Sequence, residues 1–417
     1  MSIDYSAIAS RTTRILFAAQ SLGSAGFIAA ATINSIVGAR LSGQAAWAGV
    51  PSSVYQIGGA FAAFGWGYGM DRLGRRGGLT LGLILGVIGA GLAGEALIAQ
   101  SFWIFLAGMV LMGAANSALQ LGRFVAAEVN PPAQRGRAIS NVVIGGTMGA
   151  VFGPLMVGPM GDWSKNLGLG ELSGPYVASL FLFGTAAFVI WLMLRPDPRD
   201  VGREVARLYP ETTTHHGARS IPTILRQPAT MVAISSMVIG QLTMVMVMVI
   251  TSLHMENHNH MLSDISFVIS SHTFGMYAFS IVSGRLVDRI GRAPVIVIGA
   301  ATLILACLTA PLSPDVMPIS VALFLLGLGW NFCYVGGSTL LADQLSPSER
   351  ARTQGFNDLL IGLTSGVGSL TSGLIFAALG YAMVGVVGAL VTVIPIGLML
   401  WWSLGRRAEL QNASVQN

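Results

Sequence analysis

Apolar runs long enough to cross a lipid bilayer recur along this chain from one end to the other. Each run has about 20 residues, which is the length at which a helix crosses roughly 30 Å of hydrocarbon. Only 10% of the residues are charged and 53% are hydrophobic, so a soluble globular fold is excluded. The sequence therefore predicts an all-α membrane protein with twelve transmembrane helices, at 14–38, 45–68, 77–99, 102–126, 138–160, 175–194, 229–253, 264–283, 293–311, 316–341, 354–378 and 380–404.

Basic residues predict the orientation, because Lys and Arg in short loops mark the cytoplasmic side of a membrane. If both termini are cytoplasmic, the loops on that side hold all of the 23 Lys and Arg except Arg40, Arg123 and Lys165. Both termini are therefore expected to lie in the cytoplasm. The net charge of +5 is explained by topology, so no nucleic-acid partner is expected.

Two pairs of motifs indicate that the chain is duplicated. The segments GYGMDRLGRR (67–76) and GRLVDRIGRA (284–293) share the pattern G-x-x-x-D-R-x-G-R. Each is followed by a second motif, EVNPPAQRGR (128–137) in the first half and DQLSPSERAR (343–352) in the second. Because the two pairs are displaced by almost the same interval, the sequence predicts two homologous halves of six helices each.

The first motif combines glycines, which allow close approach of helix ends, with an acid and arginines that can form ion pairs. We interpret it as a conformational latch rather than as topogenic charge alone, since topology explains the arginines but not the repeated Asp and Gly. The predicted latch residues are Asp71, Arg72, Arg75, Asp288, Arg289 and Arg292.

This doubled motif, placed between spans two and three and between spans eight and nine, resembles the signature of the major facilitator superfamily. The resemblance covers essentially the whole chain and implies two pseudo-symmetric six-helix bundles that rock around a central cavity. The expected domains are an N-terminal bundle at 1–194, a cytoplasmic linker at 195–228 and a C-terminal bundle at 229–417. The segment GAVFGPLMVGP (149–159) is similar to the family's antiporter motif, and its physical content is a bent, closely packed helix.

Methionine and histidine recur on two consecutive spans. Met244 and Met248 are four residues apart in span seven, and His272 and Met276 are four apart in span eight, so each pair shares one helix face. Counted from the loop between the spans, the two pairs lie at similar depth. Neutral thioether and imidazole ligands suit Cu(I), and an imidazole inside a span commonly faces a cavity. The alternative is that the methionines pack the core.

The pair MVMVM (244–248) and HTFGM (272–276) resembles the MxxxM and HxxxM motifs of the CcoA-type copper importers, a branch of the same superfamily. This resemblance implies copper uptake that supplies cytochrome oxidase assembly, with Met244, Met248, His272 and Met276 as copper ligands. Copper would be the substrate, and no permanently bound cofactor is expected. Related members carry riboflavin and lack these pairs.

The loop HMENHNHM (254–261) leaves two alternatives open. It captures copper at the outer mouth, or it is a polar hairpin capped by Ser263 and Asp264. The capture residues would be His254, His258, His260 and Met261. Polar residues of the first half are candidates for the opposing cavity wall, namely Asn34, Tyr55, Gln56, Asn116, Gln120 and Arg123.

The leading interpretation is a copper importer, and its rival is an organic-solute carrier or drug antiporter of the same fold. A third interpretation is a membrane assembly factor that hands copper to a partner protein. An enzyme is not expected, because no nucleophile with its base, no catalytic carboxylate pair and no nucleotide-binding loop is present. The expected partners are copper and the lipid bilayer, with a cytoplasmic copper chaperone as a further candidate.

Overall fold

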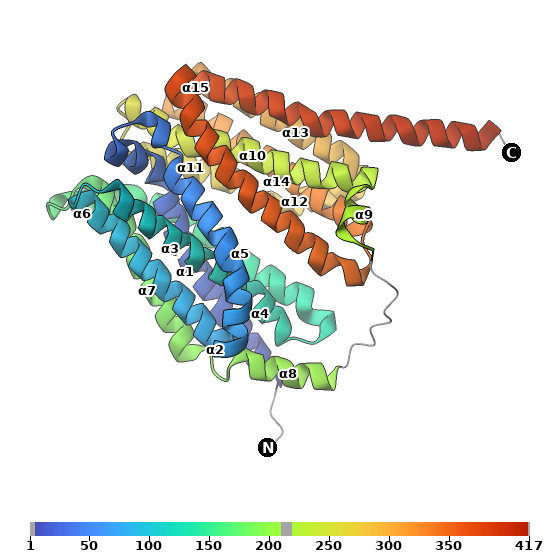
Figure 1. Ribbon diagram of the computed structural model, residues 1–417, viewed down its shortest axis with the longest axis horizontal. Coiled ribbons are helices and arrows are strands. Elements are labelled where there is room, and N and C mark those ends of the chain that lie inside the picture. Colours follow the sequence, from blue (N-terminus) through green and yellow to red (C-terminus); the bar gives the residue numbers. More distant parts are fainter. Residues whose placement is uncertain (1–4, 210–218, 416–417) are drawn as a thin grey trace. The chain divides into compact units, whose positions relative to one another are not determined.

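The computed structural model describes residues 5–209 and 219–415, and within these residues the secondary structure is helical (Figure 1). The long helices of the first half are α1 (Tyr5–Ser42), α2 (Val50–Ile98), α3 (Phe102–Gln120), α5 (Arg135–Leu155) and α7 (Gly174–Met193). Shorter ones are α4 (Gly122–Glu128), α6 (Val157–Asn166) and α8 (Pro198–Leu208). The rest of the chain forms α9 (Ile221–Leu225), α10 (Pro228–Asn257), α11 (Leu262–Tyr277), α12 (Ser280–Ile290), α13 (Arg292–Thr309), α14 (Val316–Asp343) and α15 (Pro347–Val415).

Ten helical segments in the described part of the chain are long and apolar enough to cross a membrane. The longest two, Ala45–Ile98 and Arg352–Leu404, each hold two of the expected spans. The helix in each of these two segments is interrupted by a glycine with non-helical backbone angles. This residue is Gly74 in α2 and Gly380 in α15. Counting each of these as two spans confirms the twelve-helix prediction.

The chain divides into two compact units that do not coincide with the predicted domains. The first contains residues 1–213 together with the hairpin 252–270, and the second contains 214–251 and 271–417. The predicted domain limits therefore stay a prediction. Part of the predicted linker, 210–218, and the side chains of Arg406 and Arg407 lie outside the described residues.

In the first unit, α1 packs closely on α5 along a row of glycines. A methyl group added to Gly145 would lie 2.5 Å from the Phe17 carbonyl oxygen, and one added to Gly153 would lie 2.6 Å from that of Ala25. Small residues allow this approach, which supplies van der Waals contact in a lipid environment. Gly153 belongs to the GAVFGPLMVGP segment, so the close packing predicted for this segment is confirmed. Helix α5 ends at Leu155, directly after Pro154.

The second unit places α11 against α14 at equally short range. The backbones meet where Gly275 faces the Phe324 carbonyl and Gly327 faces the His272 carbonyl, with no space for a side chain between them. On its other side α14 contacts α10, because Gly240 lies against Cys333. Helix α14 is therefore the common neighbour of the two helices that carry the predicted metal ligands.

The duplicated motif appears in the backbone as two matching breaks. Gly74 has φ 80° and ψ 167°, and Gly291 has φ 93° and ψ 166°. This region of backbone space is essentially restricted to glycine. The repeated glycine therefore ends one span and begins the next in both halves, which explains why the motif needs it.

We expect Gly291→Ala to destabilise the protein by about 1–3 kcal/mol, because the added methyl group makes only an ordinary contact of 3.8 Å with Pro294 but the backbone angles become strained. Gly74→Ala should be worse, since its methyl group would also strike the carboxylate of Asp197. Gly284→Ala is the matched control, as this helical glycine has no neighbour within 4 Å. Thermal unfolding in detergent measures the order, and equal loss in all three variants would contradict it.

Candidate functional site

The four predicted soft ligands all belong to the second unit. Three of them are buried, with exposed fractions of 4% for Met244, 0% for His272 and 7% for Met276, and Met248 is partly buried. None of the four is turned fully to the surface. The side-chain contacts do not test whether the two pairs converge, so the copper site stays a prediction.

The imidazole of His272 is fixed by helix α14. Its Nδ1 lies 2.9 Å from the carbonyl oxygen of Leu323. A carbonyl only accepts hydrogen bonds, so the ring proton resides on Nδ1 and the lone pair is left on Nε2. That Nε2 is buried and has no hydrogen-bond partner among the described residues. The Nε2 of His272 is therefore a buried nitrogen with a free lone pair, and an unsatisfied buried polar atom is costly.

The face of α10 that bears Met244 and Met248 also bears Gln241, since these residues recur at three- and four-residue steps. The Gln241 amide oxygen accepts a hydrogen bond of 2.7 Å from Trp330 Nε1 on α14. Its amide nitrogen donates one of 3.0 Å to Ser365 on α15. Through Gln241, the methionine face of α10 is thus joined to both α14 and α15.

An aromatic cluster, which we define as Tyr277, Trp330 and Tyr334, stands beside these residues. Trp330 and Tyr334 are stacked at 5.0 Å between ring centroids with planes 22° apart, and Tyr277 meets Trp330 edge-on at 6.2 Å. All three rings are partly exposed. Sequence reasoning missed this cluster, although the spacing of Trp330 and Tyr334, four residues apart within one span, was a signal for a shared face. Tyr277 follows Met276 directly in α11, so the cluster and one predicted ligand share the end of this helix.

Two of the outer histidines are in ring contact. The rings of His254 and His258 lie 4.4 Å apart. His260 approaches Asp264 at 3.9 Å, and Met261 is 72% exposed. The Asp264 carboxylate accepts a hydrogen bond of 3.1 Å from the Met261 backbone N–H, as a capped hairpin requires. Within the described ranges, no three His, Cys, Asp or Glu residues are grouped so that they could hold a metal ion.

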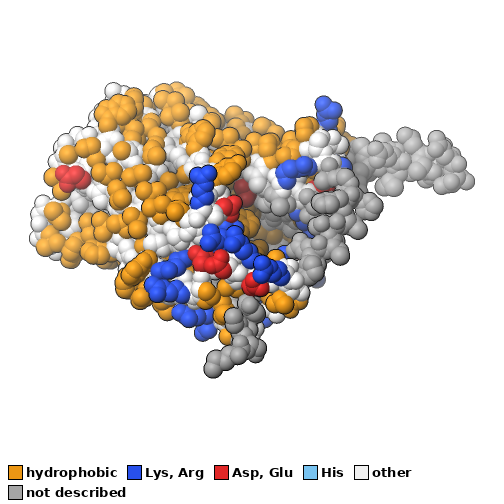
Figure 2. Space-filling view, turned by 60° about the horizontal axis from the view of Figure 1, so that its bottom comes forward, with side chains coloured by type: hydrophobic (Ala, Val, Ile, Leu, Met, Phe, Trp, Pro, Cys, Tyr) orange, Lys and Arg blue, Asp and Glu red, His pale blue; other side chains and the backbone are white. Residues whose placement is uncertain are grey.

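The repeated motifs meet through equivalent ion pairs. Arg75 contacts Glu128 at 2.9 Å and Asp71 at 2.7 Å, and Arg292 contacts Asp343 at 2.8 Å. The Arg75–Glu128 and Arg292–Asp343 pairs each join the first motif of a half to the second motif of the same half. Figure 2 shows basic and acidic side chains gathered together on the face turned toward the viewer. Sequence reasoning quoted Glu128 and Asp343 but did not predict them as partners.

The first half carries an additional anchor at this position. The carboxylate of Asp197, which precedes α8, accepts hydrogen bonds from the backbone N–H groups of Arg75 and Arg76 at 3.0 and 3.2 Å. It thereby caps the second segment of α2, which begins after Gly74. Three of the six predicted latch residues have no ion-pair or hydrogen-bond partner in the described part of the chain, namely Arg72, Asp288 and Arg289.

The polar residues proposed for the first-half wall are partly engaged in packing. The Asn34 side chain is buried and accepts a hydrogen bond of 2.9 Å from the hydroxyl of Tyr176. The Tyr55 ring contacts Phe27 at 6.0 Å, and the Arg123 guanidinium lies 4.9 Å from the ring centroid of Phe124. Asn34 therefore has a structural explanation that needs no ligand.

A further ion pair fixes the chain just before α9. The Arg219 guanidinium contacts Glu349, whose side chain is 3% exposed, at 2.8 Å. Glu349 also accepts a hydrogen bond of 3.0 Å from the Ser346 backbone N–H at the start of α15, as in a capping box. Hydrogen bonds from Arg219 and from these backbone groups hold the pKa of Glu349 well below its usual range.

The family model of the Major Facilitator Superfamily matches residues 15–259 and 232–416. The chain belongs to this superfamily. It is 33% identical over 399 residues to the uncharacterized MFS-type transporter YdeG of Bacillus subtilis, covering 95% of this chain and 92% of that one. It is 28% identical over 374 residues to the riboflavin transporter RfnT of Brucella anthropi, covering 89% and 91%.

A solved structure supports the same fold. A bacterial homologue of the human lysosomal transporter Spinster, in an inward-facing and occupied conformation, matches with a TM-score of 0.68 at 16% identity, covering 97% of this chain and 98% of that one. The chain is therefore a multi-pass membrane protein with the transporter fold of the superfamily. The more specific likeness to CcoA-type copper importers has no support in these comparisons.

We expect Glu349→Gln to lower the thermal unfolding midpoint in detergent at neutral pH, because Arg219 loses its charged partner. The pKa of Glu349 is lowered in the folded protein, so its stabilisation is complete above the ordinary value of about 4.3 and disappears as the pH falls below it. The difference between parent and variant should therefore shrink at acid pH.

Glu204→Gln is the control for that measurement, because Glu204 pairs with Arg207 on the exposed face of α8. Such a surface pair contributes little to stability, so this variant should unfold like the parent at every pH. A Glu349→Gln protein that unfolds at the parent temperature at neutral pH would contradict the role given to the pair.

Proposed function

We propose that this chain is a secondary transporter of a small organic solute with a planar aromatic ring system. The observation that carries the proposal is the aromatic cluster on α11 and α14, with the amide of Gln241 beside it. The relative RfnT, whose name gives riboflavin as its substrate, aligns over 89% of this chain and supports the same class of solute. A flavin-like ring offers both stacking surfaces and hydrogen-bond groups.

Three features of the second unit would contribute to binding such a solute. Partly exposed aromatic rings attract a planar solute by stacking, which adds to the gain from burying apolar area. The Trp330 indole and the Gln241 amide hold each other in place, so the cluster is rigid before a solute arrives. The Nε2 of His272 is buried in this structure, so it would accept a hydrogen bond from an N–H or O–H group of the solute only in a conformation that exposes this part of α11.

Riboflavin uptake into vesicles that contain only this protein tests the proposal. We expect Trp330→Leu to reduce uptake efficiency by about tenfold, the loss of one aromatic stacking partner and its buried area. Trp103→Leu is the matched control, because Trp103 is 72% exposed at the start of α3 and belongs to the first unit, whereas the cluster belongs to the second. Uptake by the Trp330 variant equal to that of the control would overturn the assignment of the site.

A second candidate substrate is Cu(I), and a specific observation favours it. His272 combines a buried nitrogen lone pair without a partner and a methionine, Met276, one turn further along the same helix. A soft cation would satisfy the lone pair, and thioethers would complete a neutral site that can release its ion. Met244 and Met248 would supply the ligands from α10.

Import is the direction that charge favours for this cargo. A monovalent cation moving inward gains about 2.3 kcal/mol per 100 mV of membrane potential, so neutral ligands suffice without an obligatory proton. Under the copper proposal, the protein lies in the bacterial inner membrane with both termini in the cytoplasm. A cytoplasmic copper chaperone would accept the imported ion. The imported copper would supply cytochrome oxidase assembly.

Copper uptake under reducing conditions, in vesicles of defined polarity, separates the two candidates. For a copper carrier we expect Met244→Leu and His272→Ala to reduce Cu(I) uptake by tenfold or more, with competition by Ag(I) but not by Zn(II). Met246→Leu is the matched control, since Met246 is buried against Gly368 of α15. Equal copper uptake by the Met244 and Met246 variants, or no uptake above empty vesicles, would exclude copper and leave the organic solute.

A further inference from the structure

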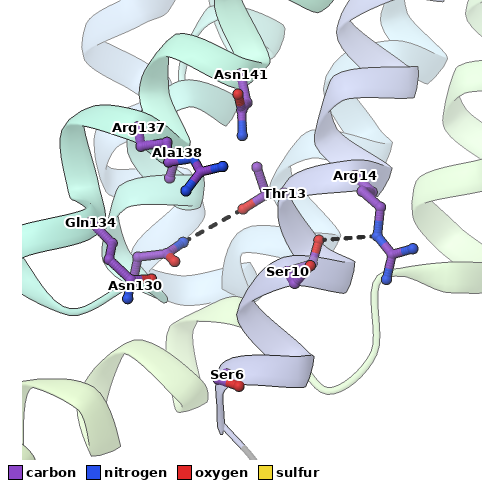
Figure 3. Close-up of a pocket in the computed structure, with 9 residues that line it drawn as sticks. All are labelled: Ser6, Ser10, Thr13, Arg14, Asn130, Gln134, Arg137, Ala138 and Asn141. Carbon is purple, nitrogen blue, oxygen red and sulfur yellow. Dashed lines mark hydrogen bonds between the residues drawn. The ribbon is translucent and has the colours of Figure 1, made fainter.

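A polar pocket of about 300 Å³ lies in the first unit between the beginnings of α1 and α5 (Figure 3). Two arginines, Arg14 and Arg137, line it, and none of its lining residues is acidic. The remaining polar lining consists of amide and hydroxyl groups, from Ser6, Ser10, Thr13, Asn130, Gln134 and Asn141. The pocket is therefore positively charged and rich in hydrogen-bond donors.

The donors of this pocket are less engaged than those of other arginines in the chain. Arg75, Arg219 and Arg292 each contact a carboxylate within 3 Å. Arg14 instead reaches only the Ser10 carbonyl oxygen, through a long hydrogen bond of 3.5 Å. Arg137 has no ion-pair or hydrogen-bond partner among the described residues. Charge-assisted hydrogen bonds are strong, so an anion here would gain donors that no protein carboxylate uses.

The backbone reinforces this charge. Helix α5 begins at Arg135, and the side chain of its preceding residue, Gln134, makes no capping hydrogen bond. The positive end of the α5 helix dipole therefore lies at the pocket, which is lined by Gln134 and Arg137 at the start of this helix. In Figure 3 the side chains of Arg137 and Asn141, one turn apart on α5, point toward the space beside Thr13 of α1.

Asn130 lines the pocket and connects the segments around it. Its amide nitrogen donates a hydrogen bond of 2.7 Å to the Ala126 carbonyl oxygen and lies 3.5 Å from the Thr13 hydroxyl. Thr13 in turn donates to the Ala9 carbonyl oxygen at 2.9 Å. These contacts join α1 to the loop before α5, so the pocket is built from a connected framework rather than from isolated surface side chains.

An apolar pocket continues from the polar one. It also has a volume of about 300 Å³, shares Thr13, Arg14 and Asn141 with the polar pocket, and adds Phe17 and Ile144 as lining. A charged head could thus lie against the arginines while an attached hydrocarbon chain follows the apolar side chains. The combined lining fits an anionic amphiphile better than it fits a small polar solute.

We propose that this pocket binds a phosphate group, held by Arg137 and Arg14 at the N-terminus of α5. Two sources share this chemistry, the head of an anionic phospholipid and free phosphate, and the apolar continuation favours the lipid. The site is independent of the solute that the protein carries, because its residues belong to the first unit and the aromatic cluster belongs to the second.

Native mass spectrometry of the full chain in a neutral detergent tests the site by titration with dihexanoyl phosphatidylglycerol, dihexanoyl phosphatidylcholine and inorganic phosphate. We expect the parent to bind the phosphatidylglycerol at least about tenfold more tightly than the phosphatidylcholine, since the two differ in net charge. Arg137→Gln should weaken phosphatidylglycerol binding by about tenfold, and Arg14→Gln provides a second variant. Arg203→Gln is the control, because it removes one exposed arginine of α8 and should leave binding unchanged.

Each result decides the proposal. Inorganic phosphate that competes only at far higher concentration than the lipid identifies the lipid as the source, whereas equal affinity identifies the free anion, and both support the site. Phosphatidylcholine that binds as tightly as phosphatidylglycerol would overturn it. So would an Arg137→Gln protein, or an Arg14→Gln protein if the former does not fold, that binds like the Arg203→Gln control.

Discussion

Hydrocarbon offers no hydrogen-bond partner to a peptide group, and most other features of this structure depend on that constraint. It requires each crossing segment to satisfy its own backbone, so the chain crosses as helices. It also leaves packing between helices to van der Waals contact, which the glycine row of α5 supplies against α1. The breaks at Gly74 and Gly291 lie beside the charged motifs, where acids and arginines can pair with freed backbone groups.

The sequence predicted the spans and the duplication because both are one-dimensional patterns. Span length follows from bilayer thickness, and the repeat follows from motif spacing, so Gly74, Gly291 and their arginines lie at equivalent positions in the two halves. The partners of those arginines were not predictable in the same way. Asp197 binds Arg75 from 122 positions away, and no local pattern marks such a contact. The same holds for Glu349 and Arg219, a pair outside the repeated motifs whose members are 130 positions apart.

The candidate site was likewise predictable only in part from the sequence. His272 could be singled out from the sequence, because an imidazole inside a span is costly unless it has a role. Its tautomer could not, since it depends on the carbonyl of Leu323, 51 residues away. The aromatic cluster depends likewise on three side chains from two helices, and only the pair Trp330 and Tyr334 shares a helix. Periodicity identifies which residues share a face, but not what that face meets.

Under both proposals, the Nε2 of His272 limits what the cargo can be. The Nδ1 of the ring is already bonded to a carbonyl, and the backbones of α11 and α14 are in close contact at Gly275 and Gly327. A purely apolar solute would leave the buried lone pair unsatisfied and would gain nothing from it. A cargo that does engage it must bring a hydrogen-bond donor or a soft cation. The organic-solute and copper proposals are thus two answers to one physical requirement, and drugs that lack a donor are the class that this residue disfavours.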